Sequence, residues 1–216
     1  MERQSLLHAT PRRTFAEAEA VRLRALDDLQ SRAGAAFDGS CSDHIGALYS
    51  IWSEVHPDSE MQLPSERWKD LGFQGADPRT DLRGCGITGL VHLERALLSH
   101  RAALDEALCG SVTSPEASPL SAFPLAIASI NCSAMLLSYL HVAPKLAVSF
   151  APGAARVGAS QATLHGFLSL GVVPEEVEDA DDDAEARARV VRLERSLEVM
   201  HARLLLRLAS SWRLMV

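Results

Sequence analysis

The chain has 216 residues, of which 47% are hydrophobic and 23% are charged, and its formal net charge at pH 7 is -7. This composition can bury a sizeable core, so we expect a single domain over residues 1–216. The acidic balance argues against nucleic acid as a partner, because phosphate binding needs a concentrated cationic face.

The N-terminal third predicts two helices after a flexible start. Residues 1–13 hold no continuous apolar stretch, so they are not a secretory signal and are expected to be flexible. Thr14 and Glu17 form a capping box that predicts a helix over 14–33, with Gly34 placed to end it. A second helix is expected from Ser42 until Pro57 stops it.

The middle of the chain predicts a short helical turn, a dense loop and a longer helix. The turn begins near Pro64, and Gly72 supplies the left-handed conformation that ends it. After the loop, helical spacing of apolar residues runs from Gly86 to Leu108, with a break expected near Ser99–His100. The residues 110–121 read as a loop rich in serine and proline.

Residues 117–142 carry no formal charge and are long enough to span a bilayer. Pro119 and Pro124 lower the propensity for insertion, so we expect a buried core helix from Pro124 to His141, with a membrane span as the alternative. Asn131 falls within this helix, where it is expected to be buried and to bond a neighbouring backbone. The protein is then expected to be soluble and cytoplasmic.

The C-terminal part predicts a short apolar piece over 163–170, an acidic run over 174–183 in solvent, and a long helix over 184–213. The apolar surface of the long helix is assigned to Val191, Leu197, Leu204, Leu208 and Trp212. No segment alternates as a strand does, so the sequence predicts an all-α fold.

The candidate motifs for cofactors and metals lack the residues or the structural context that such sites require. The glycines of 84–89 match a dinucleotide fingerprint, but no apolar strand precedes them. Asp179, Asp181 and Asp183 have calcium-loop spacing, yet the required glycine and glutamate positions hold Ala184 and Val190. The four cysteines form no Cys-x-x-Cys pair and are interpreted as structural thiols. No cofactor and no metal are predicted.

The segment 68–93 resembles the signature of the ELMO (engulfment and cell motility) domain, in particular its ELMO-domain-containing branch. Weaker resemblance continues over 123–140 and the final helix, so the domain core covers about 42–212, with 14–33 as a flanking helix. The matching residues are Trp68, Gly72, Phe73, Gln74, Pro78, Asp81, Arg83, Gly84, Gly86, Leu90 and Leu93.

The resemblance implies a compact, all-α domain with a Gly-rich loop before a central helix, acting as a GTPase-activating protein on Arf-family small GTPases. The family's catalytic arginine maps onto Arg83, which would stabilise phosphoryl-transfer charge in trans. The chain itself would bind no nucleotide, and its GTPase partner could recruit it to membranes. The alternative is a non-catalytic adaptor that binds a small GTPase or a Dock-type exchange factor.

The residues alone leave the role of Arg83 open, because an ion pair to Asp77 or Asp81 would give it a purely structural role. Asp81 is also a potential N-cap of the following helix. Gln74 could orient a catalytic water or hydrogen-bond a loop backbone, the second being favoured.

The remaining motif positions are given supporting roles. Gly84 and Gly86 would let the backbone approach a partner closely. Trp68, Phe73, Pro78 and Leu90 are expected to pack beneath the arginine. Leu82 and Cys85 depart from the more usual phenylalanine and methionine of the family motif, which bears on the choice of partner more than on the fold.

Overall fold

The computed structural model describes residues 14–83, 85–108, 123–142, 159–171 and 182–214. Within these ranges the chain is all-α and contains no strand, as predicted. The helices are α1 (Phe15–Ala33), α2 (Ser42–Val55), the 3-10 helices η1 (Glu66–Leu71) and η2 (Pro78–Arg83), α3 (Gly86–Leu108), α4 (Leu125–Tyr139), α5 (Gln161–Ser169) and α7 (Asp182–Arg213). The segments 1–13 and 110–121, and the acidic run up to residue 181, lie outside the described residues.

The predicted helix ends are confirmed by their local chemistry. The Thr14 hydroxyl accepts the Glu17 N–H, the Glu17 carboxylate accepts the Thr14 N–H at 2.7 Å, and Gly34 caps the other end of α1. In α3 the expected break falls at His100, where φ is -133° and ψ is 17°. The 3-10 helix η2 was not predicted, because a 3-10 turn this short carries no apolar periodicity.

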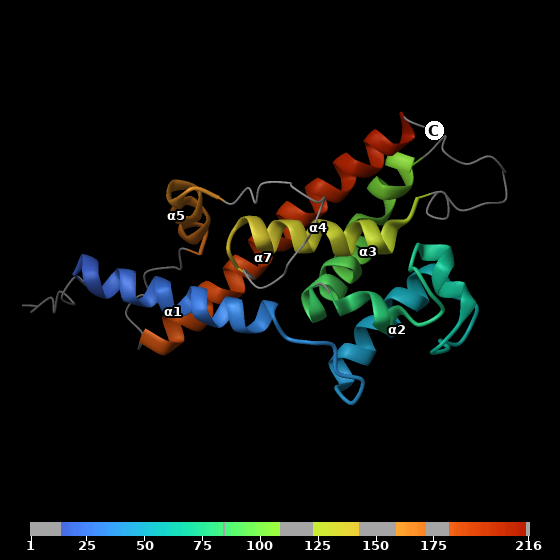
Figure 1. Ribbon diagram of the computed structural model, residues 1–216, viewed down its shortest axis with the longest axis horizontal. Coiled ribbons are helices and arrows are strands. Elements are labelled where there is room, and N and C mark those ends of the chain that lie inside the picture. Colours follow the sequence, from blue (N-terminus) through green and yellow to red (C-terminus); the bar gives the residue numbers. More distant parts are fainter. Residues whose placement is uncertain (1–13, 84, 109–122, 143–158, 172–181, 215–216) are drawn as a thin grey trace, which may run out of the picture.

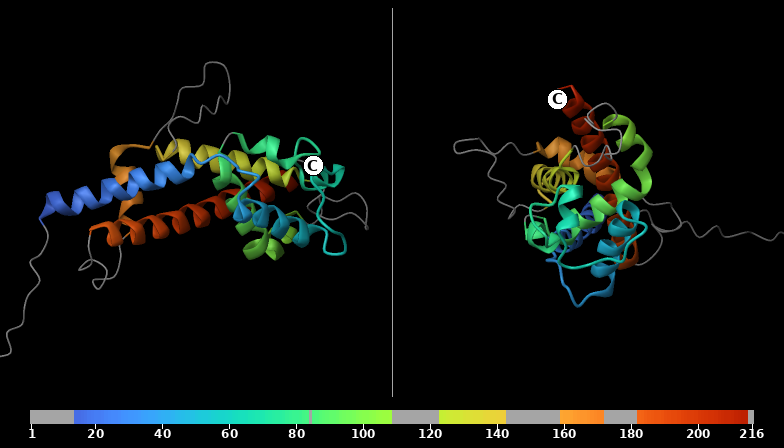
Figure 2. Two further views of the ribbon diagram at one scale, coloured as in Figure 1. Left: turned by 90° about the horizontal axis from the view of Figure 1, so that it is seen from below. Right: turned by 90° about the vertical axis from the view of Figure 1, so that its right-hand side faces the viewer.

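The core lies where α3, α4 and α7 pack against one another (Figure 1). The helix α1 runs along the N-terminal half of α7, where Arg24 pairs with Asp182 and Arg32 pairs with Glu194. The helix α2 covers α3, and Figure 2 shows α2, η1 and η2 gathered at the end of the molecule opposite the projecting ends of α1 and α7. The segment that was predicted as a loop therefore packs against one end of the helical core.

The buried stripe of α7 differs from the predicted one. Leu197 is buried as expected, but Val191, Leu204 and Leu208 are 58%, 46% and 39% exposed. The long helix has apolar residues on more than one side, and only those that face α1, α3 and α4 are covered. The buried residues of α7 include Val190, Leu193, Leu197, His201, Leu205 and Ala209.

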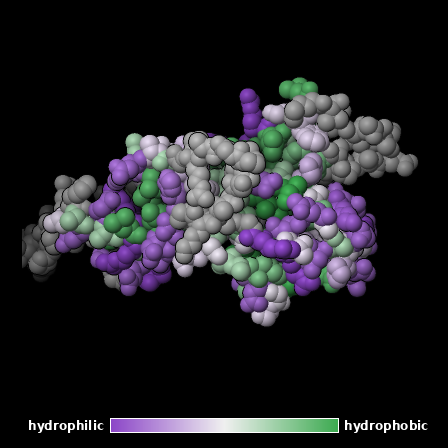
Figure 3. Space-filling model, in the orientation of Figure 1, coloured by the Kyte–Doolittle hydropathy of each residue, from purple (hydrophilic) through white to green (hydrophobic). Residues whose placement is uncertain are grey.

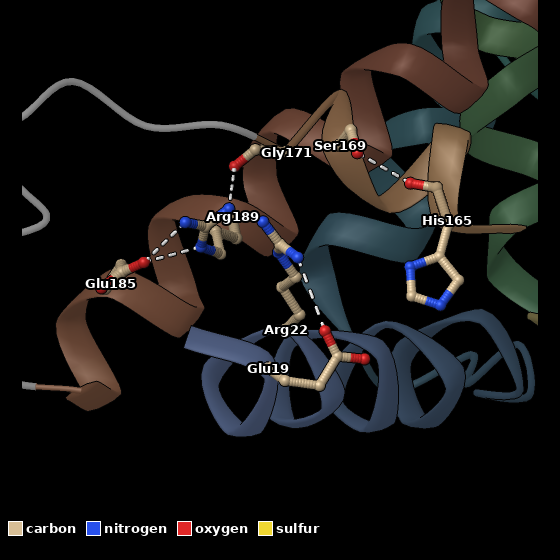
Figure 4. A network of polar contacts seen from close by, with 7 residues as sticks. All are labelled: Glu19, Arg22, His165, Ser169, Gly171, Glu185 and Arg189. Carbon is tan, nitrogen blue, oxygen red and sulfur yellow. Dashed lines mark hydrogen bonds and ion pairs between the residues drawn. The ribbon is translucent and has the colours of Figure 1, made fainter. Parts of the chain in front are cut away.

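A buried arginine of α7, Arg189, links the start of this helix to the end of the short helix α5 (Figure 4). Arg189 donates to the Glu185 carboxylate at 2.7 Å and to the carbonyl of Gly171, just after α5, at 3.3 Å. Arg189 and Glu185 are 6% and 1% exposed, so the pair is shielded from solvent. Charges this deeply buried persist only when paired and hydrogen-bonded, which makes this contact specific for one docking position.

The apolar segment forms α4, whose inner residues belong to the core. None of the helices in the described ranges is both long enough and apolar enough to cross a bilayer. The prediction for Asn131 is wrong, because its side chain is exposed. The buried polar residues of α4 are instead Ser129 and Ser133, each fully buried, so they lie on the face of the helix that Asn131 avoids.

Candidate functional site around Arg83

Three aromatic rings fix the segment that leads to Arg83. The Trp68 ring contacts the Trp52 ring of α2 with centroids 5.0 Å apart and the Phe73 ring with centroids 5.6 Å apart, both in edge-on geometry. The Trp68 indole N–H donates to the Gln62 carbonyl at 2.9 Å, which satisfies its polar atom inside the core. Trp68 and Phe73 are 2% and 4% exposed, which confirms them as packing residues.

Gly72 brings this segment against the start of α4. Its φ of 90° ends η1 in the left-handed conformation that was predicted. A Cβ atom at this position would lie 2.5 Å from the Cα of Pro124, closer than any side chain tolerates. Gly72 is therefore required twice, once by its backbone angle and once by the neighbouring helix start.

Asp77 holds the first turn of η2, which begins at the buried Pro78. The Oδ1 atom of Asp77 accepts the backbone N–H of Arg79 at 3.1 Å and its Nε–H at 2.8 Å, while Oδ2 accepts from Nη2 at 2.8 Å. The hydrogen bonds from the Arg79 side chain hold the pKa of Asp77 below its usual value. Both oxygens of this carboxylate are thus engaged by Arg79.

Asp81 ties η2 back to the loop that precedes it. Its Oδ2 atom accepts the backbone N–H of Gln74 at 2.7 Å. The prediction that Asp81 caps the following helix is wrong, because α3 begins only at Gly86. The Gln74 side chain is exposed and makes no hydrogen bond within the described residues, so the favoured loop bond is not found.

Arg83 is the last residue of η2, and its side chain is exposed. Within the described part of the chain it has no hydrogen bond or ion pair, and the bonds that Asp77 and Asp81 make go to other groups. The structural alternative, an ion pair of Arg83 with Asp77 or Asp81, is therefore not found. Arg83 borders an open depression of about 400 Å³ whose other lining residues are Gln74, Gly75, Thr80, Asp81 and Ile127.

Ile127 is the member of this lining that sequence reasoning missed. It lies on α4, more than 40 positions after Arg83, and it is partly exposed. In Figure 3 hydrophobic surface lies over the N-terminal half of α4, beside hydrophilic residues. The weak resemblance over 123–140 indicated this helix but not which of its faces borders the arginine.

Gly86 has an internal role rather than the predicted one. Its φ is 54°, and a Cβ atom there would lie 2.0 Å from the Ala35 carbonyl oxygen. The N–H of Ile87 donates to that same oxygen at 3.0 Å. The close approach that this glycine permits is thus between the start of α3 and the α1–α2 connection. Gly84 lies outside the described residues.

The cysteine between the two motif glycines is a core residue. Cys85 is 1% exposed, and its Sγ–H donates to the Ile130 carbonyl of α4 at 3.5 Å. Burial raises the pKa of its thiol to about 12, so the thiol stays protonated and unreactive at neutral pH. Cys85 and Cys132 are buried free cysteines, as expected for structural thiols, whereas Cys41 is partly exposed and Cys109 lies outside the described residues.

The arrangement presents one guanidinium on a rigid support. A guanidinium stays protonated and offers directed donors that match phosphate or carboxylate oxygens. Within the described ranges no three histidine, cysteine or acidic side chains gather as metal ligands do. Arg83 can therefore bind anionic groups and stabilise negative charge at this surface, with polar Gln74 and Thr80 and apolar Ile127 around it.

Similar proteins carry the same domain. The chain is 31% identical over 106 residues to ELMO domain-containing protein C of Dictyostelium discoideum, a match that covers 49% of this chain and 16% of the relative. It is 41% identical over 58 residues to ELMO domain-containing protein 2 of Mus musculus, covering 26% and 20%. It is 31% identical over 102 residues to ELMO domain-containing protein 1 of Homo sapiens, covering 44% and 30%.

These matches span well under two thirds of each relative's length. No solved structure matches the chain. The model of the ELMO/CED-12 family matches residues 27–215, which includes the whole of the Arg83 segment and all of the helices from α2 onward. The chain belongs to the ELMO/CED-12 family.

Proposed function

We propose that this protein is a GTPase-activating protein for Arf-family small GTPases and that Arg83 acts in trans on the partner's nucleotide. The observation that carries the proposal is the state of Arg83: exposed, at the end of a braced 3-10 turn, and without an ion-pair partner among the described residues. A guanidinium that enters another protein's active site must be able to leave its own surface, and no hydrogen bond or ion pair within the described residues holds Arg83 back.

The support around the arginine fits this task. Stabilising a phosphoryl-transfer transition state requires a cation placed beside the β and γ phosphates, which raises the rate by about 10³ to 10⁵ in GTPases that receive an arginine from a partner. Asp77 is paired with Arg79 and Asp81 accepts the Gln74 N–H, and neither carboxylate forms an ion pair with Arg83. The packing of the Trp68 ring against Trp52 and Phe73 limits how far the segment that carries Arg83 can shift.

The test is single-turnover GTP hydrolysis measured across a panel of GTP-loaded Arf-family proteins. The protein should accelerate at least one of them, and Arg83→Ala and Arg83→Lys should each remove about 10²-fold or more of that acceleration, since lysine lacks the planar fork. Arg203→Ala is a matched control that removes an exposed arginine from α7. The proposal fails if no GTPase responds or if Arg83→Ala keeps full activity.

A second function is an adaptor that binds a small GTPase or a Dock-type exchange factor without catalysis. The observation in its favour is that an arginine beside a partly exposed Ile127 is also a common composition for an interface anchor. Binding of a GTP-loaded partner that Arg83→Ala weakens, with no change in the hydrolysis rate, would select this function. In either case the protein would work in the cytoplasm and reach membranes through its GTPase partner.

A further inference from the structure

Two histidines stack inside the core, outside the Arg83 site. The rings of His92 on α3 and His201 on α7 have centroids 4.8 Å apart and planes inclined by 30°, and the residues are 3% and 1% exposed. The Nδ1 atom of His92 lies 2.9 Å from the Ser133 hydroxyl, and the Nε2 atom of His201 lies 3.0 Å from the Ser129 hydroxyl. Both serines belong to α4, so the cluster joins the three core helices.

The hydrogen-bond partners indicate which nitrogen of each histidine ring carries the hydrogen. His201 Nε2 lies 3.1 Å from the Ser129 carbonyl, which only accepts, so this nitrogen carries the hydrogen. The Ser133 hydroxyl donates to the same carbonyl at 3.1 Å, so its oxygen accepts from His92 Nδ1–H. All of these bonds form together when both rings are neutral. A second proton on either ring would place a charge in the core.

Within the described ranges neither ring is hydrogen-bonded to or paired with a carboxylate. Helix α4 has no charged side chain, and on the surrounding helices Glu198 pairs with Arg95, Glu194 with Arg32, and Glu54 with Arg101. Burial, and then the charge of the neighbouring ring, lower the pKa of His92 to about 3. Burial lowers the pKa of His201 to about 4, although its bond to Ser129 acts the other way.

We propose that the cluster of His92, Ser129, Ser133 and His201 is an acid-sensitive latch, which holds α4 against α3 and α7 while both imidazoles are neutral and releases it when they are protonated. Histidines of the unfolded chain bind protons near pH 6.5, whereas those of the closed latch do not. The latch is therefore fully effective above about pH 6.5 and weakens as the pH falls below it. Because α4 also carries Ile127, opening the latch removes one wall of the Arg83 depression. The inference holds whether or not Arg83 is catalytic.

The first test is urea unfolding of the whole chain between pH 7.5 and 4.5. Each histidine that stays neutral only in the native state raises the unfolding equilibrium constant by about tenfold per pH unit below pH 6, so two give about a hundredfold. The double variant His92→Gln/His201→Gln should lose this dependence, while His165→Gln, which changes an exposed histidine of α5, should keep it. Equal pH dependence in the wild type and the double variant would overturn the proposal.

Two measurements cover the case in which the double variant does not fold. In NMR spectra of the unsubstituted protein, the ring signals of His92 and His201 should still be neutral at pH 5, and titration of both near pH 6.5 in the folded state would overturn the latch. Cys85 bonds the Ile130 carbonyl of α4, so its exposure reports on that helix. In a Cys41→Ser/Cys109→Ser background, which keeps Cys85 and Cys132 of α4, labelling by a pyridyl disulfide, normalised to denatured protein, should be faster at pH 5 than at pH 7. A normalised rate that does not change with pH would also overturn it.

Discussion

The carboxylate of Asp81 and the backbone N–H of Gln74 are joined by a 2.7 Å hydrogen bond that closes the loop beside Arg83. The bond spans seven residues and links η2 to the chain just after the Gly72 turn. It keeps the nearest acidic side chain of the depression directed at the backbone. The position of Arg83 thus depends on a contact in which Arg83 takes no part.

Removing this contact should loosen the loop. Asp81→Ala leaves the Gln74 N–H without its acceptor and should lower the free energy of unfolding by about 1 to 2 kcal/mol, as for other lost bonds to a charged acceptor. Asp81→Asn retains an acceptor oxygen and should lose less than half of that. Urea denaturation measures both, and an Asp81→Ala protein as stable as the wild type would show that the bond has no role in the loop.

Gly86 should be the least replaceable glycine of the described motif. Gly86→Ala combines a φ of 54° with a Cβ atom 2.0 Å from the Ala35 carbonyl, so we expect a loss of about 3 kcal/mol or more. Gly46→Ala is the matched control, since its helical site is open and alanine should stabilise α2 by about 0.5 to 1 kcal/mol. Thermal unfolding of both variants measures the difference, and equal melting temperatures would contradict it.

Ile127 should matter for partner binding and little for folding. Ile127→Asp puts a charge on the apolar side of the Arg83 depression, so the GTPase concentration needed for half-maximal acceleration should rise by about tenfold or more. The maximal rate should change little, because Arg83 is retained. Leu98→Asp is the control, since it changes a side chain that is 51% exposed on α3 and does not line the depression. An unchanged half-maximal concentration for Ile127→Asp would remove α4 from the interface.

Helices whose ends carry caps could be predicted from the sequence, because the signals are local. The Thr14 capping box, the Gly72 turn and the break at His100 all depend on residues close in the chain. The residue types of the motif also led to the candidate site around Arg83. The packing roles expected for Trp68 and Phe73 followed from the size and apolar character of their side chains.

Features that depend on which helix faces which could not be predicted in this way. The exposed position of Asn131 and the buried stripe of α7 are set by how α4 and α7 are rotated about their axes in the core. Gly86 was assigned to a partner's approach because nothing in the local pattern indicates that Ala35 lies beside it. The same holds for Ile127, and for His92 and His201, which are more than 100 residues apart and meet only after folding.

The last prediction concerns the ion pair of Asp77 with Arg79. Arg79 lowers the pKa of Asp77 in the folded state, so the pair stabilises the protein above the unfolded pKa near 3.9, and this stabilisation is lost as the pH falls through the folded pKa. Arg79→Ala should therefore lower stability slightly at pH 7, by less than about 1 kcal/mol for a partly exposed pair, and the difference from wild type should shrink as the pH falls below about 4 and vanish below the folded pKa of Asp77. The Asp77 carboxyl signal in NMR should titrate at a higher pH in Arg79→Ala than in wild type. Lys69→Ala, which breaks an ion pair with Glu66 on η1, should leave that titration unchanged. If Asp77 titrates identically in all three proteins, Arg79 does not hold this carboxylate in solution, and the Asp77 carboxylate would be available to pair with Arg83.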